Sequence, residues 1–75
     1  MNAPRGIDQA DLDNRFNFHP ATDVTGPKHE EVRTRMRVLA QALTLLVPPG
    51  RELSLAITAM EEAMMWANAG IARHQ

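Results

Sequence analysis

Pro48-Pro49-Gly50 separates two segments with helical periodicity, and this break constrains the fold of the chain more than any other feature. Proline lacks a backbone N–H donor and disfavours helical geometry in the residue before it, so a helix ends here. Apolar residues recur every three or four positions over residues 27–47, and again over residues 51–72. Two long helices joined by so short a connection pack as an antiparallel hairpin. The sequence therefore predicts an all-α fold.

A short helix is predicted before the hairpin. Asp8 can accept a hydrogen bond from the backbone of Asp11 and so cap a helix over residues 9–16. Leu12 and Phe16 give this helix an apolar face that is too small to fold alone. We therefore expect the helix to dock on another surface.

The remaining N-terminal residues predict a tail and an arm. Residues 1–6 have almost no apolar side chain to bury and are expected to form a disordered tail. Residues 17–26 are rich in turn formers and include Pro20, which favours an extended backbone in the residue before it. Residues 7–75 are thus expected to form a single helical hairpin domain with an N-terminal arm.

Both long helices carry more apolar surface than one shared seam can cover. A chain of 75 residues without cysteine has no disulfide to stabilise a small core, so the surplus favours packing against further copies as a homo-oligomer. Arg35 falls inside the apolar arc of the first long helix, with Lys28 two turns earlier, so both are expected to point towards a packed surface. The predicted seam stripes are Val32, Met36, Leu39, Leu43 and Leu46 before the break and Leu53, Ile57, Met60, Met64, Ala67 and Ile71 after it; the second stripes are Val38, Ala42 and Leu45, and Leu55, Ala59, Ala63, Trp66 and Gly70.

The charged and polar side chains exclude several classes of function. A formal net charge of −1 lacks the basic field that binding to duplex DNA requires. The three histidines lie in different segments and form no metal-binding pair, and Glu61 and Glu62 point in different directions on a helix. Ser54 and Thr58 have no histidine at helical reach that could activate them as nucleophiles. We therefore expect no enzyme activity, no metal and no cofactor. No apolar run reaches a membrane span or resembles a signal peptide, so we expect the cytosol.

Phe18 and Trp66 each have two possible roles. Phe18 in an exposed arm can stack on a nucleobase, or it can pack on the hairpin as a hydrophobic latch. Trp66 stands among small residues and either fills the core or lines a cavity at an interface.

The arginines of the first long helix are candidates for anion binding. Arg33 and Arg37 lie one helical turn apart and can hold a phosphate with their planar guanidinium groups. The alternative is local ion pairing, because Glu30 is spaced to meet Arg33, and Glu31 to meet Arg35.

Two segments resemble a known family: RFNFHP at residues 15–20 and LAITAMEEAMMWANAGIAR at residues 55–73. They are similar to the phage hairpin-domain family that includes anti-CBASS protein two and a related anti-Thoeris sponge, where CBASS is the bacterial cyclic-oligonucleotide-based antiphage signalling system. The resemblance spans residues 15–73, and MEEAMMWANAGIAR is its most specific part. It implies a helical hairpin that assembles as a homohexamer and binds cyclic dinucleotides between protomers without hydrolysing them. Some members of the family also hold cyclic trinucleotides at separate sites.

The resemblance implies a set of residues for the cyclic dinucleotide. The family pattern Arg-Phe-x-Tyr-His aligns with residues 15–19, so Phe18 takes the place of a tyrosine that stacks on a base, and it lacks the hydroxyl. His19 and Pro20 complete this arm motif. The family also has a phosphate-binding lysine near the start of the first long helix. Arg33 and Arg35 are the first candidates to correspond to it here, followed by Arg37 and Lys28.

The cyclic trinucleotide site of the family corresponds to the end of the last helix. Arg73 keeps a basic residue there, and Ala67 and Gly70 keep small ones.

The resemblance implies a phage immune-evasion protein of the host cell cytoplasm. It is expected to sequester cyclic dinucleotides such as cGAMP, and cyclic trinucleotides, without degrading them, so that CBASS effectors are not activated. The alternative is a structural or adaptor helical-hairpin oligomer that has no ligand. A binder of single-stranded RNA is disfavoured by the nearly neutral charge.

Overall fold

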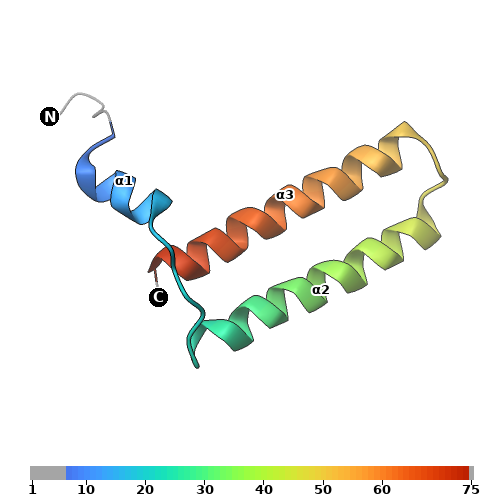
Figure 1. Ribbon diagram of the computed structural model, residues 1–75. Helices are drawn as coiled ribbons and strands as arrows, with labels where there is room; N and C mark the ends of the chain where they lie inside the picture. Colours follow the sequence, from blue (N-terminus) through green and yellow to red (C-terminus); the bar gives the residue numbers. More distant parts are fainter. Residues whose placement is uncertain (1–6, 75) are drawn as a thin grey trace, which may run out of the picture.

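The computed structural model describes residues 7–74, which form three helices. Helix α1 spans Gln9–Phe16, α2 spans Thr25–Leu46 and α3 spans Arg51–His74. Helices α2 and α3 lie side by side and antiparallel, and α1 lies at the open end of this hairpin, far from the connection between α2 and α3 (Figure 1). The predicted all-α class and the order of a short helix followed by a hairpin are confirmed over these residues. The tail expected at residues 1–6 lies outside the described part of the chain.

Helix α1 has the predicted bounds, and its start is set by short-range hydrogen bonds between side chain and backbone. The Asp11 backbone N–H donates to Asp8 Oδ1 at 2.9 Å, and the Asp8 backbone N–H donates to Asp11 Oδ2 at 3.4 Å. This reciprocal pair satisfies two donors that the first turn of a helix leaves without partners.

No residue of α1 is buried, and Leu12 and Phe16 are exposed, so the expected docking of α1 is not made within the single chain.

Helix α2 begins two residues before the predicted start at Pro27, because threonine side chains build its first turn. The Thr25 backbone N–H donates to Thr22 Oγ1 at 3.0 Å, and the Thr22 backbone N–H donates to Thr25 Oγ1 at 2.8 Å. The Gly26 backbone N–H then donates to the Thr22 carbonyl at 2.8 Å, as in a helix. Thr25 is only 5% exposed, so the first residue of α2 is shielded from solvent.

The seam between α2 and α3 contains both predicted and unpredicted residues. Val32, Met36, Met60 and Met64 are half-buried there as predicted. The prediction was wrong for Leu39 and Leu46, which are 51% and 78% exposed, and for Ala67, which is also exposed. An apolar arc wider than half the helix circumference does not reveal which part of it faces the partner helix. The half-buried residues that take their place are His29 and Ala40 on α2 and Ala56 and Asn68 on α3.

The hairpin leaves two apolar strips uncovered. Among the described residues no hydrophobic side chain is buried, and even Trp66 on α3 is 64% exposed. The radius of gyration is 16.5 Å, whereas a compact domain of this length has about 11 Å. The outer strip of α2 comprises Lys28, Arg35, Val38, Leu39, Leu45 and Leu46, and the outer strip of α3 comprises Leu55, Ala59, Ala63, Trp66 and Gly70; all of these residues are exposed.

Candidate functional site

A groove runs along the hairpin between α2 and α3. It has a volume of about 330 Å³, and its floor is apolar while its rim is charged. Arg33 and Arg37 stand on the α2 side, and Glu61 stands on the α3 side. Between them lie Met36, Ala40, Ile57, Met60 and Met64. The predicted pair Arg33 and Arg37 is therefore brought to one groove, one turn apart.

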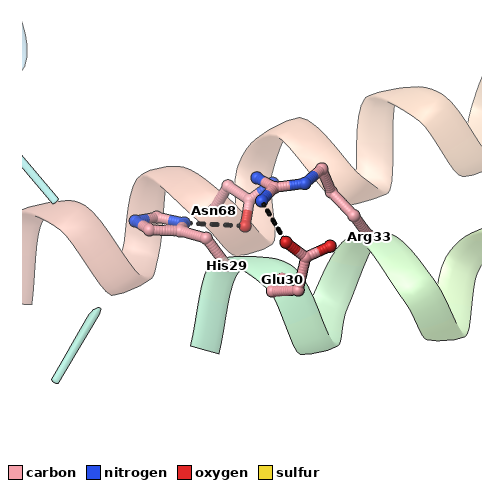
Figure 2. A network of polar contacts seen from close by, with 4 residues as sticks. All are labelled: His29, Glu30, Arg33 and Asn68. Atoms are coloured by element: carbon pink, nitrogen blue, oxygen red, sulfur yellow. Dashed lines mark hydrogen bonds and ion pairs between the residues drawn. The ribbon is translucent and has the colours of Figure 1, made fainter. Parts of the chain in front are cut away.

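A polar contact crosses the hairpin near its open end. His29 Nδ1 and Asn68 Oδ1 are 2.9 Å apart, and since a carbonyl oxygen only accepts, the histidine nitrogen is the donor (Figure 2). Sequence reasoning considered His29 only as a metal ligand and missed its seam position. The signal was present, because His29 precedes Val32 and Met36 at helical spacing and Asn68 follows Met64 by one turn.

Arg33 makes the local ion pair that its spacing predicted. Its Nη2 lies 3.4 Å from Glu30 Oε1 (Figure 2), and both side chains are more than half exposed. An exposed pair of this kind contributes about 0–1 kcal/mol. Arg33 can therefore exchange Glu30 for a phosphate at little cost.

Arg35 faces away from the groove. It forms the predicted ion pair with Glu31 on α2, and its side chain is 79% exposed. The expectation that Arg35 points towards a packed surface is wrong within the single chain. Lys28, two turns earlier on the same outer strip, is exposed as well.

The arm presents an aromatic ring at the open end of the hairpin. Phe18 is 87% exposed, so it does not act as a latch on the hairpin of its own chain. His19 is half-buried, and its Nε2 lies 2.7 Å from the Asn14 carbonyl oxygen, which fixes the chain just after α1. Pro20 is exposed beside it.

The residues that the resemblance assigns to a cyclic trinucleotide lie near the C-terminal end of α3. Ala67 and Gly70 are exposed, and Arg73 is half-buried. A Cβ added at Gly70 would meet no atom within 4 Å. This part of α3 is thus an open surface in the single chain.

The family model described as "Acb2/Tad1, hairpin domain" matches residues 8–72 of the chain. This chain belongs to the Acb2/Tad1 hairpin-domain family. The match runs from the capping residue Asp8 through both helices of the hairpin, so the family identified by resemblance is confirmed. No curated protein and no solved structure matches the chain.

The family match contains the arm, the basic residues of α2, and Ala67 and Gly70 of α3, and it ends one residue before Arg73. Arg33 and Arg37 share the groove, whereas Arg35 lies on the outer strip of α2. Within residues 7–74 no group of three histidine, aspartate or glutamate side chains could hold a metal ion. No helix in the described part of the chain is long and apolar enough to cross a membrane. The arrangement offers guanidinium groups and an exposed ring, which can bind anions and flat rings.

Proposed function

We propose that this member of the Acb2/Tad1 hairpin-domain family binds cyclic oligonucleotide messengers and sequesters them without breaking a bond. The observation that carries the proposal is the family match over residues 8–72. Cyclic dinucleotides such as cGAMP are the proposed ligands, and CBASS effectors in the host cell cytoplasm are deprived of them. The protein then acts stoichiometrically, since the free ligand concentration falls with the number of sites and their affinity.

The proposed assembly is a homohexamer whose binding pockets lie between copies. Support comes from the absence of any buried hydrophobic side chain among the described residues of one chain. A helix whose apolar strip remains in water is marginally stable, whereas a second copy can cover that strip without any new sequence feature. The outer strips of α2 and α3 are the proposed interfaces.

Phe18 is proposed to stack on a base of the cyclic dinucleotide, with His19 and Pro20 shaping the arm around it. Its exposure supports this role, because a ring already packed on the hairpin would not be free to stack. Stacking on an aromatic side chain contributes about 1–3 kcal/mol per base.

Arg35 and Lys28 are the proposed phosphate ligands. Both lie on the outer strip of α2, where a second copy would enclose them and strengthen their interaction with an anion. Arg33 and Arg37 are the second pair to test, because they face the groove of their own chain rather than the proposed interface. Cyclic trinucleotides are proposed to bind separately, at Ala67, Gly70 and Arg73.

Calorimetric titration of the full chain with cyclic GMP–AMP tests this function. We expect saturable binding to the assembled protein, and much weaker binding of the linear dinucleotide with the same bases. An assembled protein that takes up neither ligand would contradict the proposal and would support the alternative, a structural or adaptor oligomer.

A further inference from the structure

Three methionines lie on the floor of the groove between α2 and α3. Met36 comes from α2, and Met60 and Met64 come from α3, where they are one helical turn apart. All three side chains are half-buried. Met65, the next residue of α3, is 62% exposed and does not line the groove. The thioether groups of the floor are therefore only partly covered in the hairpin.

The register of the hairpin brings these methionines to one level. The contact between His29 and Asn68 sets which parts of α2 and α3 lie opposite one another, and both helices rise about 1.5 Å per residue. Seven positions along each helix from this contact, Met36 stands at the level of the turn between Met60 and Met64. The three residues thus form one methionine layer of the seam.

Methionine is also the only sulfur-containing residue type of this chain, which has five methionines and no cysteine. A peroxide transfers one oxygen atom to a thioether, so that a lone pair of the sulfur forms the S–O bond of methionine sulfoxide. The O–O bond breaks, and hydrogen peroxide leaves as water. The sulfur is oxidised and the peroxide is reduced. No cysteine thiolate competes for the oxidant in this protein.

Oxidation changes the physical character of the methionine layer. A methionine is a flexible apolar side chain that fills gaps between helices, whereas its sulfoxide is polar and favours contact with water. A polar group in a half-buried seam costs free energy unless it finds a hydrogen-bond partner. Within residues 7–74 the hairpin has no fully buried hydrophobic side chain, so no deeper apolar layer can compensate for the loss.

We propose that Met36, Met60 and Met64 form an oxidation-sensitive site, at which conversion to methionine sulfoxide by a peroxide loosens the hairpin. The groove and the outer strips of α2 and α3 share no residue, so the proposed interfaces between copies do not include the methionine layer. Sulfoxide reductases convert methionine sulfoxide back to methionine, which makes the change reversible. The site involves no ligand and is independent of the proposed sequestering function.

Graded oxidation of the full chain with hydrogen peroxide tests the proposal. Tandem mass spectrometry locates each sulfoxide, and the melting temperature is measured at each stage. We expect Met65 to be oxidised first without a change in melting temperature, because it is exposed and lies outside the groove. Oxidation of the groove methionines should then lower the melting temperature by about 5 °C or more. A constant melting temperature during oxidation of the groove would overturn the proposal.

Leucine variants separate the methionine layer from damage elsewhere. A variant with Met36→Leu, Met60→Leu and Met64→Leu keeps an apolar floor of similar size and is expected to keep its melting temperature in peroxide. The matched control is Met65→Leu, which removes a thioether outside the groove and is expected to remain as sensitive as the parent protein. Equal sensitivity of the two variants would contradict the assignment to the groove.

Repair of the oxidised parent protein gives a second readout that needs no substitution. Two sulfoxide reductases, one for each sulfoxide epimer, should restore both the parent mass and the parent melting temperature. A melting temperature that stays low after the parent mass has returned would show that the sulfoxides are not the cause, and the proposal would fail.

Discussion

The inner and outer sides of the hairpin differ in how much of their apolar surface a single chain can cover. On the inner side, α2 and α3 half-bury one another along a seam that ends in the contact between His29 and Asn68. On the outer side, large apolar residues such as Leu46 and Trp66 remain in water. The inner seam therefore specifies the shape of the hairpin, whereas the outer strips leave apolar surface exposed, for which further copies of the chain are the proposed partners.

The basic residues follow the same division. Arg33 and Arg37 belong to the inner side because they line the groove, and Arg35 and Lys28 belong to the outer strip of α2. A ligand held between copies would depend on the outer pair.

The largest expected effect comes from placing a charge on the outer strip of α3. Trp66→Glu is predicted to dissociate the assembly, since an unpaired carboxylate in an interface costs about 3–5 kcal/mol. Light scattering should give a parent mass near six times 8.4 kDa and a much smaller mass for the variant. Ser54→Glu, on the exposed flank of α3, is the control and should keep the parent mass. A monomeric parent protein at micromolar concentration would contradict the outer-strip account.

Removing a basic side chain separates the outer strip from the groove. Arg35→Ala is predicted to weaken cyclic dinucleotide binding by about 1.5–3 kcal/mol, through loss of a charge-assisted contact with phosphate. The melting temperature should change little, because the exposed pair with Glu31 contributes only about 0.2–0.5 kcal/mol. Calorimetry on Arg33→Ala and Arg37→Ala provides the comparison, and both should retain more affinity than Arg35→Ala. Unchanged affinity in all three would exclude these arginines and leave Lys28 as the one proposed phosphate ligand of α2 still to be tested.

Phe18 lies in the arm, outside both the inner seam and the outer strips. Its replacement is expected to weaken ligand binding somewhat less than Arg35→Ala does. Phe18→Ala should weaken cyclic dinucleotide binding by about 1–3 kcal/mol through loss of stacking, without changing the mass of the assembly. Phe18→Tyr keeps the ring and restores the hydroxyl, so its affinity should equal or exceed that of the parent. If Phe18→Ala instead dissociates the assembly, the ring is a latch between copies and not a stacking platform.

The smallest effect is expected within the inner seam. Breaking the hydrogen bond between His29 and Asn68 should lower the free energy of unfolding by about 0.5–1.5 kcal/mol. A double-mutant cycle with His29→Ala and Asn68→Ala, followed by thermal melts, isolates this interaction from the effect of each substitution. Additive losses would show that the contact does not couple the two helices.

The local sequence was sufficient to predict a helix boundary wherever a few neighbouring residues set it. The aspartate cap gave the start of α1, and the double proline with glycine gave the hairpin connection. The start of α2 was misplaced because two threonines replaced the usual acidic partner in the cap, a weaker signal in sequence. Periodicity identified the apolar surface and not its partner, so it assigned Leu39 and Leu46 to the seam.

The candidate site was predictable only in its residue types. Helical spacing placed Arg33 beside Arg37 and each glutamate beside its arginine, because these are contacts within one helix. The groove depends on how α2 packs against α3, and the ligand pocket is proposed to depend on further copies, so neither follows from the periodicity of one segment. His29 and Asn68 show the same limit, since their contact joins residues 39 positions apart.

Recovery of the ligand after binding tests sequestration without degradation most directly. Assembled protein in excess is mixed with cyclic GMP–AMP, the free nucleotide is measured by ultrafiltration, and the protein is then denatured by heat and the released nucleotide is analysed by chromatography and mass. We expect almost no free ligand before heating, and we expect all of it to return as the intact cyclic dinucleotide afterwards. A linear or mononucleotide product, or ligand that stays free throughout, would contradict it.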